Sequence, residues 1–175
     1  DRAFPLGGRR VSSVPALRAR VLLAEVYARQ HRFPEALQMF DHAADDAETE
    51  GYRSVLGDAL LGQGDVLAHI GDMSLAVAKY QQVLKVAETS RDPGAEVDAL
   101  IRLARVFSQL GLAEQASQHS QRALSKAVTT GDRVREAEAR VAVAALVVGR
   151  RWLTASDRSG LQRALASYVQ HGDVA

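Results

Sequence analysis

The chain of 175 residues contains no cysteine and only one tryptophan. Without cysteine it can form no disulfide, thiol nucleophile or thiolate metal site, which agrees with a reducing compartment such as the cytoplasm. No stretch approaches the roughly 18 uncharged apolar residues that a membrane-spanning helix requires, so we expect no membrane segment. The formal net charge is only +1, and the chain therefore offers no overall field to attract nucleic acid or anionic lipid.

Aromatic residues are also scarce, at 5% of the chain, whereas hydrophobic residues make up 47% and are rich in alanine. Small apolar side chains favour close-packed helices over strands, which need β-branched and aromatic residues. Asparagine is absent, and Lys79, Lys85 and Lys126 are the only lysines. We interpret that skew as a sign of a GC-rich bacterial genome. The composition as a whole predicts an all-α protein.

A period of 40 residues runs along the chain. Segments that begin at His31, Gly71 and Gly111 align without gaps. Small and large apolar residues recur in the same order, as in the sets Ala36, Ala76 and Ala116; Phe40, Tyr80 and Ser120; and Ala43, Val83 and Ala123. A fourth copy fits when one residue is inserted near 150–156. A period of this length is typical of helical repeats, so each copy predicts a pair of amphipathic helices.

We expect eight helices, joined by short turns. Their predicted ranges are 15–30, 34–50, 53–70, 73–89, 93–110, 113–130, 133–149 and 156–170. Asp92 and Pro93 supply a cap and a first-turn proline, and Gly111 and Gly131 suit the left-handed conformation that ends a helix. Because residues 1–14 lack a period, we expect an irregular leader or linker there. The repeat domain would then span 15–175, with units at about 15–50, 53–89, 93–130 and 133–170.

Several of these positions resemble the tetratricopeptide repeat family, in which small residues allow close helix packing. The matching residues are Leu23, Ala24, Tyr27, Ala36, Phe40 and Ala43 in the first unit, and Leu103, Ala104, Phe107, Ala116 and Ala123 in the third. The period of 40 differs from the usual length of about 34, and the proline that commonly closes a unit is absent. Longer units of this kind resemble those of bacterial signalling proteins and of kinesin light chain-like scaffolds.

The resemblance implies a right-handed superhelix, an α-solenoid of about four antiparallel helix pairs. Its first helices would line a concave groove that accepts a peptide or a partner helix. The groove residues that the family register implies are Arg18, Val21, Glu25, Arg29, Asp58, Leu61, Asp65, His69, Asp98, Ile101, Arg105, Gln109 and Val141. We therefore expect a protein or peptide partner and no cofactor.

One repeat place in this register is apolar in every unit. It holds Val21, Leu61, Ile101 and Val141, with acidic residues on either side. An apolar ladder of this kind suits an amphipathic ligand with basic flanks. Alternatively, the ladder points partly into the core, because these helices are longer than is usual in the family.

Catalytic and metal-binding patterns are weak in this sequence. His31, His42 and His69 each lie one helical turn from a carboxylate, but none has the further ligand or nucleophile that a site requires. The acidic run at 41–50 is interpreted as a solvated outer face rather than a cation site. No glycine-rich phosphate loop follows a strand. We therefore expect no metal site and no enzymatic activity.

Two functions remain open at this point. The first is a protein-interaction module that binds its partner in the groove. The second is a sensory or regulatory segment of a larger bacterial signalling protein or transcription regulator, which would act through ligand binding or self-association. The chain begins with Asp1 and shows no signal peptide, so we expect a fragment of a longer protein. Leu161, Leu165 and Val169 on the last predicted helix suggest a homodimer through that end.

Overall fold

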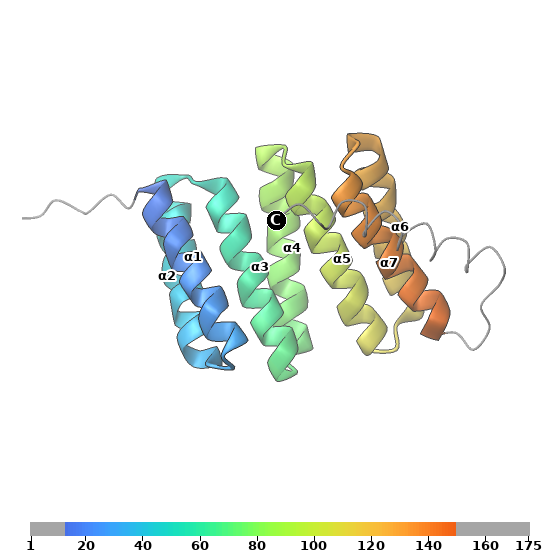
Figure 1. Ribbon diagram of the computed structural model, residues 1–175, viewed down its shortest axis with the longest axis horizontal. Helices are drawn as coiled ribbons and strands as arrows, with labels where there is room; N and C mark the ends of the chain where they lie inside the picture. Colours follow the sequence, from blue (N-terminus) through green and yellow to red (C-terminus); the bar gives the residue numbers. More distant parts are fainter. Residues whose placement is uncertain (1–12, 150–175) are drawn as a thin grey trace, which may run out of the picture.

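The computed structural model describes residues 13–149, which form seven helices and no strand (Figure 1). The helices are α1 (Val14–Arg29), α2 (Phe33–Glu50), α3 (Arg53–Ile70), α4 (Met73–Ser90), α5 (Pro93–Gln109), α6 (Ala113–Thr130) and α7 (Arg133–Gly149). Each predicted helix in this range agrees with an observed one to within one residue at both ends. The expected helix at 156–170, its dimer surface and nearly all of the expected leader lie outside the described residues.

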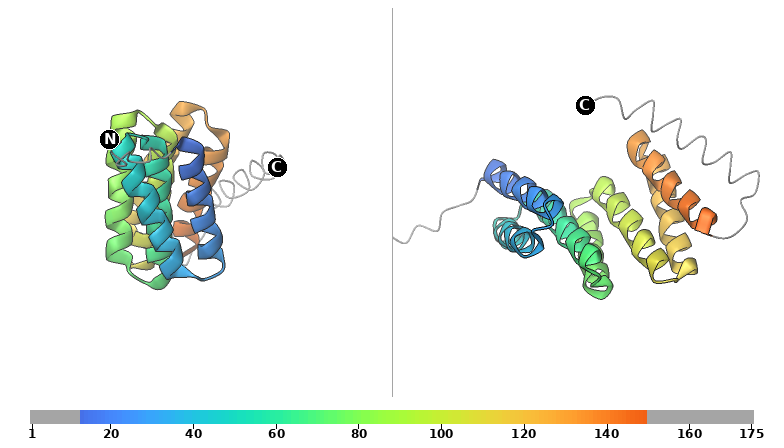
Figure 2. Two further views of the ribbon diagram at one scale, coloured as in Figure 1. Left: turned by 90° about the vertical axis from the view of Figure 1, so that its left-hand side faces the viewer. Right: turned by 60° about the horizontal axis from the view of Figure 1, so that its bottom comes forward.

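The helices form two layers (Figures 1 and 2). Helices α1, α3, α5 and α7 each contact the next member of this set, whereas α2, α4 and α6 contact only the helices that precede and follow them in the chain. The first set therefore lies closer together and forms the inner, concave layer. This arrangement is that of an α-solenoid, as predicted from the 40-residue period.

Equivalent residues of the repeat occupy equivalent places in the core. Ala36, Ala76 and Ala116 are each fully buried near the start of an outer-layer helix. The other matched small positions that are buried include Ala24, Gly64 and Ala104, and Ala47, Ala87 and Ala127. Since a side chain no larger than a methyl group lets two helix backbones approach, these positions set the spacing between the layers.

The turns follow the predicted chemistry. The carboxylate of Asp92 accepts a hydrogen bond from the backbone N–H of Ala95 at 3.0 Å, which caps the first turn of α5. Gly131 has a φ of 70° at the end of α6. Arg91 is in the same left-handed region, with a φ of 55°, where the equivalent residues of the other units, Gly51 and Gly131, are glycines. An arginine in this conformation carries a backbone cost of about 1 kcal/mol.

None of the helices within residues 13–149 is both long enough and apolar enough to cross a lipid bilayer.

The packing at Ala76 can be tested by enlarging this side chain. We expect Ala76→Leu to lower the free energy of unfolding by about 1–3 kcal/mol, because the larger side chain cannot be accommodated at a fully buried helix contact. Ala78→Leu is the matched control, since Ala78 is exposed on the same helix and the change there should stay within about 0.5 kcal/mol. Urea unfolding followed by circular dichroism measures both. Equal stability of the two variants would contradict the assigned register.

Candidate functional site

A cleft opens on the inner face of the solenoid, lined mainly by residues of α1 and α3, with two residues each from α2 and α5. Its volume is ≈ 850 Å³. We call it the inner cleft and define it by its lining residues, Arg18, Val21, Leu22, Glu25, Ala28, Arg29, His31, Phe33, Phe40, Asp58, Leu61, Gly62, Asp65, Val66, His69, Asp98 and Arg102. Acidic, basic and apolar side chains all contribute, so the cleft suits a ligand that has both polar and apolar groups.

Most of the candidate groove residues line this cleft. They are Arg18, Val21, Glu25, Arg29, Asp58, Leu61, Asp65, His69 and Asp98. Two more, Arg105 and Gln109, line a smaller cavity of ≈ 310 Å³ that shares Asp65, His69 and Arg102 with the inner cleft. Ile101 and Val141 line neither of these two cavities. The structure thus brings most of the candidate residues to these two cavities, and their role in binding a partner stays a prediction.

The apolar ladder is mostly part of the core. Val21, Leu61 and Ile101 are only 6%, 8% and 7% exposed, whereas Val141 is 47% exposed. Of the two alternatives given above for the ladder, the burial of these three residues agrees with the one in which it points into the core. The physical reason is that consecutive inner helices pack against each other, so that the neighbouring helix already covers this place. Only the edges of Val21 and Leu61 reach the inner cleft.

Three rings lie together at one end of the inner cleft. The ring centroids of Phe33 and His69 are 5.0 Å apart, and those of His31 and His69 are 5.7 Å apart. His31 also packs edge-on against Phe33 at 5.6 Å. Contacts of this geometry stabilise an aromatic cluster. His69, which the register implied, thus contacts two other rings at this end of the cleft. Those two residues, His31 and Phe33, were not among the residues that the register implied.

A carboxylate on α3 joins two helix layers and two repeat units. Asp65 accepts a hydrogen bond from the Tyr80 hydroxyl at 2.8 Å and forms an ion pair with Arg102 at 2.9 Å. The Tyr80 ring reaches Asp65 by passing over Gly64, where an added Cβ would lie 2.4 Å from Cε1 of the ring. Burial raises the pKa of the Tyr80 phenol, and the charge of Asp65 adds to this shift. Both effects keep the phenol protonated as a hydrogen-bond donor.

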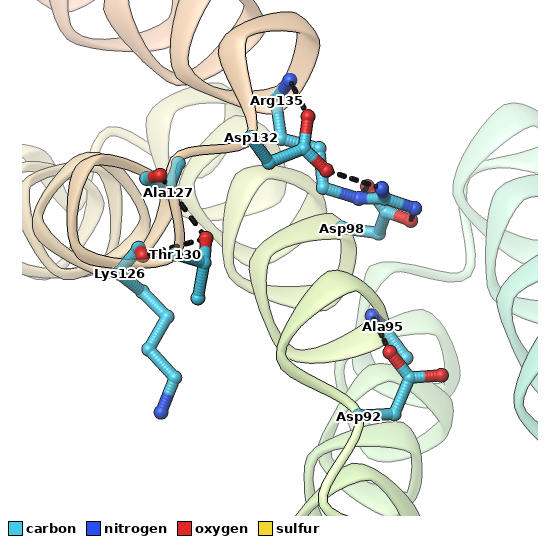
Figure 3. A network of polar contacts seen from close by, with 8 residues as sticks. All are labelled: Asp92, Ala95, Asp98, Lys126, Ala127, Thr130, Asp132 and Arg135. Carbon is cyan, nitrogen blue, oxygen red and sulfur yellow. Dashed lines mark hydrogen bonds and ion pairs between the residues drawn. The ribbon is translucent and has the colours of Figure 1, made fainter.

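A second ion pair joins α5 to α7 (Figure 3). Arg135 donates from Nε to Asp98 at 3.0 Å and from Nη2 at 2.9 Å, so the pair is bidentate. Asp132 holds the same guanidinium group through Nη1 at 2.7 Å. These hydrogen bonds raise the pKa of Arg135, which stays charged. The Arg135 guanidinium lies against Gly94, where an added Cβ would be 3.0 Å from Cζ.

Two other acidic residues of the inner cleft differ from Asp65 and Asp98. Within residues 13–149, no ion pair or side-chain hydrogen bond joins Glu25 or Asp58 to a basic residue. Burial raises the pKa of Asp58; Arg18 opposes the shift, and the like charges of Asp92, Glu25 and Asp98 add to it. Together these effects disfavour the charged form of the Asp58 carboxyl group.

Some residues that line the cavities were not among the sequence-based candidates. Arg102 lines both cavities and is absent from the predicted set, although the 40-residue register relates it to Leu22 and Gly62 in the earlier units. Leu22 is 61% exposed and lines the inner cleft. The signal that could have identified Arg102 is a change of charge at one repeat position, since the equivalent residues Leu22 and Gly62 are uncharged.

Among the described residues, no group of three or more histidine and acidic side chains has a geometry that could hold a metal ion. The pairs seen in the sequence at His31, His42 and His69 gain no third ligand in this part of the chain.

The fold and its inner cleft define a helical repeat of the solenoid class. Residues 16–89, which span α1 to α4, match the model of the tetratricopeptide repeat family. The predicted resemblance is therefore confirmed, and residues 16–89 are similar to tetratricopeptide repeats. The fold is a scaffold of the kind on which protein–protein interaction surfaces are built.

Two solved structures share the fold. Aspartyl phosphate phosphatase F from Bacillus subtilis matches with a TM-score of 0.74 and 17% identity, covering 89% of this chain and 39% of that one. BtubC (BKLC) from P. vanneervenii matches with a TM-score of 0.71 and 14% identity, covering 91% of this chain and 66% of that one. The chain thus spans less than two thirds of the length of either. At these identities the likeness shows the fold alone. No curated protein matches the sequence.

The contact between Tyr80 and Asp65 predicts an alkaline loss of stability. Because the folded protein raises the pKa of Tyr80, its contribution is fully present below the ordinary tyrosine value of 10.0 and is lost as pH rises above it. We expect Tyr80→Phe to cost about 1 kcal/mol at neutral pH. Above pH 10 the wild type should lose stability faster than the variant, by up to about 1.4 kcal/mol per pH unit. Urea unfolding from pH 7 to 11 measures this, and parallel curves would disprove the assignment.

Proposed function

We propose that the chain is a protein-interaction module whose inner cleft binds a segment of a partner protein. The observation that carries this proposal is the inner cleft itself, which combines the exposed Leu22 with two carboxylates, Glu25 and Asp58, that form no ion pair or side-chain hydrogen bond with a basic residue among the described residues. An amphipathic segment with basic flanks would cover Leu22 and neutralise the carboxylates. Val21, Leu61 and Ile101 are buried and contribute little of this contact. The binding energy would therefore come from exposed side chains of α1 and α3 such as Leu22, Glu25 and Asp58.

In this proposal the protein binds its partner and catalyses no reaction. The inner cleft contains two histidines, His31 and His69, but their rings contact each other and Phe33. A nucleophile activated by a base, or a metal with three ligands, would be needed for hydrolysis or group transfer. A cytoplasmic location is part of the same proposal and agrees with the absence of cysteine.

A regulatory segment of a larger bacterial signalling protein is a second candidate. It is supported by the 40-residue period, because units of this length resemble those of bacterial signalling proteins. In that case the inner cleft would receive a ligand and the attached domain would respond. The complete sequence of the protein distinguishes the two roles, because a chain without an output domain would exclude the second one.

The role of the inner cleft can be tested by a change at Leu22. Peptides would be selected from a random displayed library of about twelve residues on the wild-type protein, and their dissociation constants measured by calorimetry. We expect Leu22→Arg to weaken binding by about tenfold or more, because it removes apolar contact area and repels basic groups. Leu22 is exposed, so the fold should be unaffected.

Leu75→Arg is the matched control for this experiment. Leu75 is 51% exposed on α4 and does not line the inner cleft, so the same substitution there should leave peptide affinity unchanged. Circular dichroism and melting temperature would verify that both variants fold. If selected peptides bind the Leu22→Arg protein as tightly as the wild type, the inner cleft is not their binding site.

A further inference from the structure

The inner layer binds guanidinium groups at two places of the repeat. Asp65 on α3 pairs with Arg102 on α5, and Asp98 on α5 pairs with Arg135 on α7. In both pairs the arginine follows the aspartate by 37 residues. Each arginine therefore crosses from one inner helix to the carboxylate of the preceding one. The repeat thus uses the same contact twice, at two different places along the helix.

The same two places carry acidic residues one repeat earlier. Glu25 on α1 is equivalent to Asp65, and Asp58 on α3 is equivalent to Asp98, by the 40-residue register. The residues that follow them by 37 positions are Gly62 and Ala95, whose side chains are too short to reach a carboxylate. No internal arginine from the next inner helix therefore serves Glu25 or Asp58, and both acids line the inner cleft.

Electrostatics at Asp58 favour an additional cation. Burial raises the pKa of the Asp58 carboxyl, and Arg18 is the one basic residue that counteracts the shift. The attraction of Arg18 is not enough to cancel burial and the like charges of Glu25 and Asp98. A positive group brought into the inner cleft would stabilise the charged form of Asp58. By contrast, Asp98 already has such a group in Arg135.

Apolar surface lies beside these carboxylates in the inner cleft. The cleft includes the edges of Val21 and Leu61, and Gly62 lies directly against the Phe40 ring, with an added Cβ only 2.2 Å from Cζ. These side chains are largely buried, and Leu22, which is 61% exposed, supplies more of the apolar surface of the cleft. The methylene stem of an arginine packs well on such a surface while its charged end reaches an acidic group.

We propose that the inner cleft contains a subsite for an arginine side chain of the partner protein, held between Glu25 and Asp58 as the guanidinium group of Arg135 is held between Asp98 and Asp132. This inference rests on the proposed function, that the inner cleft binds a protein segment. A guanidinium group fits better than an ammonium group, because its planar set of five N–H donors can serve two carboxylates at once.

The test uses the library peptides selected on the wild-type protein. Each arginine of the tightest peptide is replaced in turn by citrulline, which has nearly the same shape without the charge, and by lysine. At one arginine we expect citrulline to weaken binding to the wild type by about 10- to 100-fold, as for a charge-assisted hydrogen bond. Lysine should restore only part of this loss.

A double-mutant cycle assigns the contact to the two acids. The double variant Glu25→Gln and Asp58→Asn should bind the arginine and citrulline peptides almost equally, because the charge that the arginine meets has been removed. The control is Asp45→Asn with Glu48→Gln, which removes two exposed acids from the outer helix α2. The control protein should keep the full preference for arginine over citrulline.

The results separate failure of the subsite from failure of the proposed function. If Leu22→Arg weakens peptide binding but the affinity does not depend on any arginine of the peptide, the subsite is overturned and binding in the cleft stands. The same conclusion follows if the lysine peptide binds as tightly as the arginine peptide. If the double variant keeps the preference for arginine over citrulline, Glu25 and Asp58 are not the subsite. If Leu22→Arg affects no selected peptide, the inner cleft is not a binding site and both proposals fail.

Discussion

Close approach of helix backbones at small residues is the constraint on which this structure depends. Ala36, Ala76 and Ala116 are fully buried at equivalent places of three outer-layer helices. A larger side chain at any of them would push the layers apart and change the stacking angle between units. Because the inner layer is positioned by these contacts, the shape of the inner cleft also follows from residues on the opposite side of the core.

The sequence was sufficient to predict the helices and their pairing. A 40-residue period with alanine at matched positions leaves few arrangements that bury the apolar side chains. The turn residues then define the ends, as at Asp92, whose carboxylate caps α5. The positive φ of Arg91 was not predicted, because an arginine gives no local signal for this conformation. The repeat register would have suggested it, since the equivalent residues, Gly51 and Gly131, are glycines with a positive φ.

The residues that line the inner cleft were harder to predict than the fold. The family register identified the helix faces that line the inner cleft, but it could not say how closely successive inner helices pack. Val21, Leu61 and Ile101 are largely covered for that reason. Contacts between units, such as Asp65 with Arg102, join residues 37 positions apart and depend on the stacking angle. A repeat period alone does not determine that angle.

The ionic contacts between inner helices are distributed unevenly along the array. They join α3 to α5 and α5 to α7, whereas within residues 13–149 no ion pair joins α1 to α3. Added salt screens partly exposed ion pairs and leaves apolar contacts intact or stronger. The junctions after α3 should therefore loosen in concentrated chloride relative to the first one, so the order in which the units of the solenoid separate during unfolding would depend on ionic strength.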